Sequence, residues 1–258
     1  MLKFGVVNRI FITLFCLLFL ANYWLSIPVS LFAVFGFIWF ALTVFGSFFI
    51  QWNYHFKSYH KNQNSTENKI AITFDDGPHP EFTPKALDLL EKYNAKATFF
   101  CIGKEIEKYP SIVSQILKGG HTIGNHTYSH TRNFGFLSTE NVKQELERTN
   151  TIVKKSFGLE LRLYRPAFGV TNPRIKRVLQ RTGFISIGWS VRSLDTTKRS
   201  PKRILNRTVK NLKKGDIILL HDTSVKTMAV LEQLLLFLRQ QEMQSVTVNE
   251  LLDISAYE

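Results

Sequence analysis

The sequence predicts an α/β protein in which a parallel sheet closes, fully or partly, into a (β/α) barrel, preceded by an N-terminal transmembrane helical hairpin. Two observations support this fold class. Residues 10–56 contain no Asp, Glu, Lys or Arg and are rich in Phe, Leu, Ile and Val. After residue 69, short apolar segments alternate regularly with amphipathic ones. An uncharged run of that length indicates membrane insertion, and the alternation indicates strands connected by helices.

The N-terminal run is too long for a single spanning helix. At roughly 1.5 Å per residue it would form a helix of about 70 Å, whereas the hydrocarbon core of a bilayer is about 30 Å thick. Pro28 within "LSIPVS" divides the run, because proline ends one helix or begins the next. We therefore predict two spans, at about 6–25 and 29–51, with Trp24 and Trp52 suited to the interface. A cleavable signal peptide, and one span plus an interfacial segment, are the alternatives.

Charges flank the predicted spans unevenly. Lys3 and Arg9 lie at the start of the first span, Lys57 and Lys61 follow the second, and the loop 22–28 carries no positive charge. Positive residues prefer the cytoplasmic side, so this pattern favours a cytoplasmic location for both ends of the hairpin. The prediction is a two-pass cell-membrane protein, and the family resemblance described below favours the opposite face for the domain.

Residues 1–52 would be the membrane anchor, 53–68 a polar linker, and 69–258 the α/β domain. After residue 66 the chain holds 29 of its 33 Lys and Arg residues and all 20 acidic residues. For a tethered domain, this basic excess indicates attraction to anionic membrane lipid or to an anionic polymer. No nucleic-acid-binding motif is present, and no oligomeric state is predicted.

Seven strands and six helices are expected in the domain. "STENVKQELERTNTIVKKSFG" begins with Ser138 as cap and ends at Gly158, and "TPKALDLLEKY" has Thr83 as cap before Pro84. Seven or eight such units favour a closed or partly closed parallel barrel over an open sheet. The strand candidates are 69–74, 97–101, 121–125, 161–164, 184–189, 216–221 and 245–248, and the helix candidates are 83–93, 104–118, 138–158, 172–182, 201–213 and 226–241.

Polar clusters follow five of these strands, each at the carboxyl end. The clusters are "TFDDGP", "NHTYSH", "YRPAFG", "WSVRSLD" and "LLHD". In a parallel barrel the carboxyl ends of the strands form one face, and active sites lie there. The sequence therefore predicts a single site that contains Asp75, Asp76, His126, His130, Arg165, Asp195 and His221.

The histidines suggest a metal site. His126 and His130 are four residues apart, so on a helical turn they share a face. Two imidazoles and one carboxylate, with open positions, make a hydrolytic zinc- or iron-type centre, and Asp75 or Asp76 can supply the carboxylate. Both aspartates reach one site only if the chain turns after the strand, which the following Gly-Pro permits. His121 lies at the other end of its strand, where a structural hydrogen bond is expected.

Taken together, these motifs resemble those of the polysaccharide deacetylase family, the NodB-like catalytic domain of carbohydrate esterase family four, over about residues 69–250. "TFDDGP" and "HTYSH" match strongly, and "LLHD" matches the last motif. "YRPAFG" departs from the family's R-P-P-Y-G pattern at Ala167 and Phe168. "WSVRSLDT" matches loosely, since the usual Asp-Trp pair is absent. The family fold is a distorted β/α barrel.

The resemblance also implies a role for each matching residue. One divalent metal ion is expected, bound by three residues. Zn²⁺ is the first choice, and Co²⁺ or another divalent ion is the alternative. A general base and a general acid, each paired with a second residue, would stand beside the ion. The metal ligands would be Asp76, His126 and His130. Asp75 would be the general base, held by Arg165, and His221 would be the general acid, held by Asp195. The substrate pocket would be lined by Phe168, Trp189 and Leu219.

The function implied is a metal-dependent hydrolase that removes N-acetyl groups from amino sugars of a polysaccharide such as peptidoglycan or a chitin-like chain. A deacylase of a lipid-linked amino sugar at the membrane surface is the first alternative, and the predicted spans and basic domain suit it. A non-catalytic sugar-binding scaffold is the second alternative. The sequence disfavours that scaffold, because every chemically required residue is present.

Overall fold

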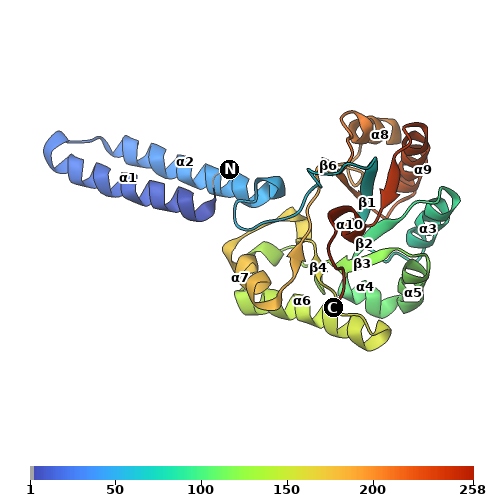
Figure 1. The fold of residues 1–258 in the computed structure, drawn as a ribbon. Helices are drawn as coiled ribbons and strands as arrows, with labels where there is room; N and C mark the ends of the chain where they lie inside the picture. Colours follow the sequence, from blue (N-terminus) through green and yellow to red (C-terminus); the bar gives the residue numbers. More distant parts are fainter. Residues whose placement is uncertain (1–2) are drawn as a thin grey trace.

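The computed structural model describes residues 3–258 and shows a helical hairpin that projects from an α/β domain (Figure 1). The hairpin consists of α1 (Phe4–Leu25) and α2 (Val29–Phe48), which lie side by side and are joined by the turn that contains Pro28. Both helices have a mean hydropathy of 2.2 and are long enough to cross a membrane, as the sequence predicts. A signal sequence shares these properties.

The base of the hairpin is packed on the domain. After α2, the short helix η1 (Ile50–Trp52) places Ile50 in a buried apolar cluster that also contains Trp189. The backbone N–H of Thr171 donates to the carbonyl of Ser47 (2.9 Å), and the side-chain amide of Gln51 donates to the carbonyl of Trp189 (2.9 Å). The hairpin is therefore held by direct contacts as well as by its covalent connection.

The domain is built on a curled parallel sheet, which confirms the predicted barrel-like fold. The strands run in the order β5-β4-β3-β2-β1-β7-β6, and β8 pairs with the beginning of β1. Every pairing between these strands is parallel. The strands are β1 (Lys69–Asp75), β2 (Ala97–Cys101), β3 (Thr122–Asn125), β4 (Leu163–Tyr164), β5 (Ile185–Ser186), β6 (Val191–Arg192), β7 (Ile217–His221) and β8 (Gln244–Val246).

The segment 53–68 makes backbone contacts both at β5 and just before β7. The N–H of Tyr59 donates to Ser186 O (2.9 Å), and the N–H of Gly188 donates back to Tyr59 O (2.8 Å). Three residues later, the N–H of Asn62 donates to Gly215 O (2.8 Å). The segment expected to act as a linker is thus bound to the barrel through its own backbone.

Helices surround the outside of the sheet (Figure 1). The predicted caps of α6 are confirmed, because Ser138 accepts a hydrogen bond from Asn141 N and Gly158 ends the helix with φ +70°. The predicted Thr83 cap is wrong: α3 begins earlier, and the Thr83 hydroxyl donates to Asp222 instead. The helices are α3 (Phe82–Lys92), α4 (Gly103–Lys108), α5 (Pro110–Lys118), α6 (Thr139–Phe157), α7 (Pro173–Thr182), α8 (Pro201–Val209), α9 (Val225–Gln240) and α10 (Val248–Leu252), with short turns η2 (Phe134–Phe136) and η3 (Ala167–Gly169).

Strand alternation decides which side chains face the interior of the barrel. In β1, Ile72 and Phe74 pack in the larger core cluster with residues of the surrounding helices. The intervening residues Thr73 and Asp75 point to the opposite face, since successive strand residues alternate. Asp75 is the register partner of His221 on β7, so two adjacent strands end with a polar side chain at the same level. Asp75 and His221 at these strand ends both line the candidate active site.

Candidate active site

Asp75 is held by a buried arginine. Its side chain is almost fully buried, and Arg165 Nη1 lies 2.7 Å from its Oδ1. The same Nη1 donates to Thr73 Oγ1 (2.6 Å), and Nη2 donates to Gly188 O (2.9 Å). A buried charge is costly without a partner, so these contacts compensate both the arginine and the carboxylate. One oxygen of Asp75 is thereby fixed, and Oδ2 lies 3.9 Å from His126 Nε2.

The two neighbouring aspartates face the same site because the backbone reverses at the second one. Asp76 has φ +74°, in the left-handed region that an Asp adopts more readily than most residues. Its carboxylate therefore does not point away as the next residue of a regular strand would. The chain turns at Asp76 itself, one residue before the Gly-Pro that the sequence suggested.

Asp76, His126 and His130 form a cluster with the composition of a metal site. Their candidate ligand atoms all lie within 4.8 Å of one another. Asp76 Oδ1 is 3.4 Å from His126 Nε2 and 3.5 Å from His130 Nε2. Burial acts to raise the pKa of Asp76, but the hydrogen bond and charge of His126 outweigh it and hold the pKa well below its usual range. The carboxylate is ionised and available to a cation.

Neighbouring groups orient the two imidazoles. His126 Nδ1 lies 3.0 Å from the carbonyl of Arg165, which leaves Nε2 directed at the aspartates. Burial, followed by the charge of His126, lowers the pKa of His130 to about 4, so this ring is neutral with a free lone pair. A ring nitrogen fixed on a backbone carbonyl is a common support for a histidine metal ligand. These three residues fit a divalent ion with open positions.

A glutamate that sequence reasoning missed shapes the loop between the histidines. Glu145 on α6 accepts from Tyr128 N (3.1 Å), Ser129 N (2.8 Å) and Ser129 Oγ (2.8 Å). His130 itself has φ +48°, so the loop is not the regular helical turn assumed from the spacing. No spacing rule connects Glu145 to the histidine motif, because the contact is made by a separate helix.

His221, which is partly exposed, pairs with the buried Asp195. Asp195 Oδ1 lies 2.8 Å from His221 Nδ1, and Oδ2 accepts from the backbone N–H of His221 (2.8 Å). Thr227 and Ser193 also donate to this carboxylate (both 2.9 Å). Burial acts to lower the pKa of His221, but the hydrogen bond and charge of Asp195, aided by Asp75 and Asp76, raise it to about 9. The imidazole is protonated at pH 7.

The position of Asp195 differs from the prediction in one respect. Of the fifth predicted strand, 184–189, only Ile185–Ser186 forms a strand, β5, which pairs with β4; a separate strand that was not predicted, β6, follows it and pairs with β7. Asp195 follows β6 and not the fifth strand. It still reaches the site, because β6 lies beside β7 and brings Asp195 next to His221.

These groups line one cavity of about 300 Å³. Phe168 is 47% exposed, and its ring centroid lies 4.5 Å from that of His130. Trp189 and Leu219 are buried in the wall, and Arg165 and Asp195 lie behind it. The cavity also contains Arg192 and Thr196, which were not singled out although they belong to the quoted "WSVRSLDT" segment. All ten predicted site residues are thus in the cavity or in contact with a residue that lines it.

Comparisons with known proteins agree with this geometry. The family model described as polysaccharide deacetylase matches residues 62–187. A peptidoglycan-N-acetylglucosamine deacetylase of Bacillus cereus is 39% identical over 196 residues, which cover 73% of this chain and 90% of that protein. A chitooligosaccharide deacetylase of Azorhizobium caulinodans is 36% identical over 157 residues, covering 60% and 74%. Some other relatives are longer, and the match covers as little as 39% of their length.

A solved structure shows the same architecture. The crystal structure of the Bc1960 peptidoglycan N-acetylglucosamine deacetylase aligns with a TM-score of 0.72 and 32% identity, over 78% of this chain and 94% of that one. The parallel half-barrel, the sequence match and the Asp-His-His cluster all point to the same assignment. The chain belongs to the polysaccharide deacetylase family.

Proposed function

We propose that the protein is a metal-dependent hydrolase that removes N-acetyl groups from amino sugars of a polysaccharide such as peptidoglycan or a chitin-like chain. The observation that carries the proposal is that one cavity brings together the Asp76–His126–His130 cluster and two ion-paired residues, Asp75 with its partner Arg165 and His221 with its partner Asp195. Relatives that act on peptidoglycan and on chitooligosaccharides support this substrate class.

The roles follow from the charge state of each group. Asp76, His126 and His130 would hold a divalent ion such as Zn²⁺, which would supply Lewis acidity toward the acyl oxygen and toward water. Asp75, fixed by Arg165 with one oxygen facing the cavity, takes the proton of the attacking water. The backbone N–H of Phe168 donates a hydrogen bond to the oxyanion that forms during the attack. Because this donor belongs to the backbone, it is present whether position 168 holds the Tyr of the family pattern or the Phe of this chain.

His221 is the proton donor for the departing amine. An amine leaves poorly unless it is protonated, and the raised pKa of His221, about 9, keeps the imidazole charged at neutral pH. Asp195 is a positioning residue, because it fixes Nδ1 and leaves Nε2 to act. Leu219 and Trp189 enclose the space next to these groups, which suits the methyl of an acetyl group.

Asp195→Asn is expected to move the alkaline limb of the pH–rate profile to lower pH. The acid form of His221 is required, so the rate falls as pH rises through the pKa of His221. Removing the carboxylate removes the main influence that raises this pKa, which then moves toward the ordinary histidine value of about 6.5. Initial rates from pH 5 to 10 measure the shift. Asp88→Asn, an exposed substitution on α3, is the control, and an unmoved alkaline limb would remove Asp195 from the mechanism.

The activity itself is tested with the purified full chain in detergent and loaded with Zn²⁺. Release of acetate from N-acetylated chitooligosaccharides and from peptidoglycan fragments is expected, with no release from the corresponding free amino sugars. Absence of acetate from every N-acetylated substrate, by a chain shown to be folded and metal-loaded, would favour the non-catalytic sugar-binding alternative.

A second candidate is deacylation of a lipid-linked amino sugar at the membrane surface. The observation that favours it is that the hairpin base contacts the cavity wall through Gln51, which donates to Trp189, and contacts the segment after the lining residue Gly169 through Ser47, which accepts from Thr171. We propose that the hairpin is a two-pass cell-membrane anchor, so the cavity would lie close to the bilayer. Comparing acetate release from lipid-linked and polymeric sugars distinguishes the two substrates.

The face of the membrane that carries the domain decides between the same substrates. The flanking positive charges favour the cytoplasm, where a lipid-linked or precursor sugar would be met, whereas finished wall polymer lies outside. Reporters active only on one side of the membrane can be fused after Glu258. The flanking charges predict that the reporter is active in the cytoplasm. A reporter active outside the cell would instead make finished wall polymer the favoured substrate.

A further inference from the structure

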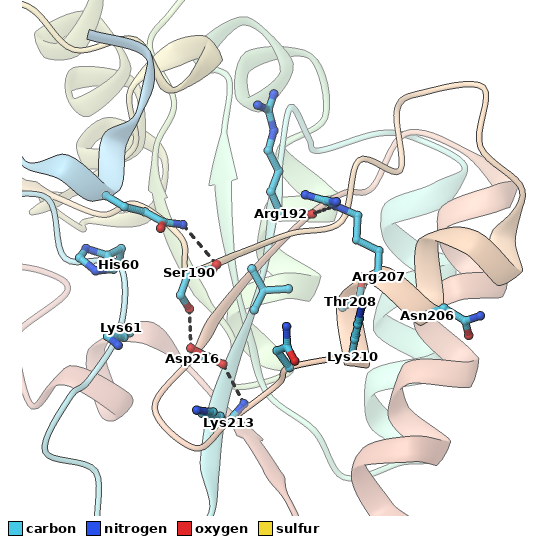
Figure 2. Close-up of a pocket in the computed structure, with 13 residues that line it drawn as sticks. His60, Lys61, Ser190, Arg192, Asn206, Arg207, Thr208, Lys210, Lys213 and Asp216 are labelled. Carbon is cyan, nitrogen blue, oxygen red and sulfur yellow. Dashed lines mark hydrogen bonds between the residues drawn. The ribbon is translucent and has the colours of Figure 1, made fainter. Parts of the chain in front are cut away.

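A second cavity lies between the hairpin base and the catalytic cavity. Its volume is about 790 Å³, against about 300 Å³ for the catalytic cavity. Gln51 of η1 and His60 and Lys61 of segment 53–68 line one side, and residues of β6, of α8 and of the turn before β7 line the others (Figure 2). Arg192 lines both cavities. The second cavity is therefore lined in part by the hairpin base, and it shares a lining residue with the proposed active site.

The lining of this cavity is strongly basic. Asp216 is its single acidic residue, and its oxygens already accept from Ser190 Oγ (2.8 Å) and from the backbone N–H of Lys213 (2.8 Å). Within residues 3–258, no ion pair involves any of the lining cations. The lining cations come from separate segments, and Figure 2 shows the side chain of Arg192 directed away from Asp216; they are Lys61, Arg192, Arg207, Lys210 and Lys213.

Such a lining matches one kind of ligand. Like charges around one cavity repel each other, and an anion that enters it relieves the repulsion. Lysine ammonium groups and arginine guanidinium groups are the common partners of phosphate oxygens, and the side-chain amides of Asn206 and Asn211 add neutral donors. A phosphate ester accepts hydrogen bonds from both kinds of group.

The position of the cavity indicates where the phosphate comes from. Gln51 is three residues beyond the end of α2, and it is flanked by the exposed, stacked rings of Phe49 and Trp52 (5.4 Å between centroids). Exposed aromatic rings at the end of a spanning helix mark the level of the lipid headgroups. We infer that this cavity binds the phosphate group of an anionic phospholipid in the leaflet next to the catalytic domain.

The inference rests on the proposed membrane placement of the hairpin, but not on the catalytic roles. Binding can therefore be measured without any activity. The full chain in a neutral detergent is titrated with dihexanoylphosphatidylglycerol, dihexanoylphosphatidylcholine and inorganic phosphate, and binding is followed by calorimetry. The test variant is Lys61→Gln, Lys210→Gln, Lys213→Gln. The matched control carries the same loss of charge on α4, α5 and α6: Lys108→Gln, Lys118→Gln, Lys155→Gln.

The anionic lipid is expected to bind the unaltered chain and the control alike, and the test variant at least about ten-fold more weakly. The zwitterionic lipid and inorganic phosphate are expected to bind weakly to all three. Circular dichroism and the thermal midpoint verify that both variants are folded. If the test and control variants lost affinity for the anionic lipid equally, the effect would come from overall charge, and the proposed binding site would be wrong. Equal affinity for inorganic phosphate and the anionic lipid would overturn the assignment to a lipid.

Discussion

Asp75→Asn is expected to lower the deacetylation rate by about 10²–10⁴-fold while the protein retains its metal ion. The substitution keeps the shape of the side chain and removes the negative charge that accepts the proton of water. The proposed ligands Asp76, His126 and His130 are untouched, so the metal content should not fall. Steady-state rates and metal analysis of the same preparation, by atomic emission, measure both quantities.

The neighbouring substitution provides the contrast. Asp76→Asn is expected to lose metal as well as activity, because it removes one of three ligands. Asp88→Asn, on the exposed face of α3, is the matched control and should change neither quantity. An Asp75→Asn variant that is empty of metal, beside an Asp76→Asn variant that is loaded, would exchange the roles of the two residues.

Replacing both histidines is expected to abolish metal binding and activity together. In the His126→Ala, His130→Ala variant only Asp76 remains of the three ligands, and one carboxylate holds a divalent ion poorly. In the unaltered protein, a chelator should remove the activity, and Zn²⁺ or Co²⁺ should restore it. Metal content after dialysis and rate after metal addition are the measurements.

His60→Ala serves as the control here, because His60 lines the second cavity and lies outside the catalytic one. It should keep both metal and activity. Full metal occupancy in the double histidine variant would show that the ion is held elsewhere. Activity that survives the chelator, with metal removal verified, would contradict the metal-dependent mechanism.

The location of the site was predictable because strand ends and motifs can both be seen in one sequence. Asp75 and His221 each end a continuous apolar run, and parallel pairing then places them at the same level. The sequence could not predict contacts between elements whose separation along the chain follows no rule. Glu145 supports the histidine loop from α6, and Arg192 enters the cavity from a strand of two residues. A strand that short leaves no periodic pattern to detect.

The connection between the hairpin and the domain illustrates a second limit. Residues 53–68 lack apolar periodicity, which is usual for a linker. In the structure, the N–H groups of Tyr59 and Asn62 bond to Ser186 and Gly215, and such backbone bonds require no particular side chain. The same reasoning explains Thr83, whose hydroxyl could cap α3 but donates to Asp222, a residue far away in the sequence.

If the hairpin spans a membrane as proposed, its contacts with Trp189 and Thr171 would hold the catalytic centre at a fixed distance from the bilayer. With the hairpin in a bilayer, the catalytic centre cannot swing outward as it could on a loose tether. Its encounter with substrate would then be a search in two dimensions along the membrane surface. If the domain lies outside the cell, only polymer strands next to the membrane would be modified, and older strands displaced outward would keep the pattern they received there. The distribution of free amines across the thickness of a wall would then record when each strand was made.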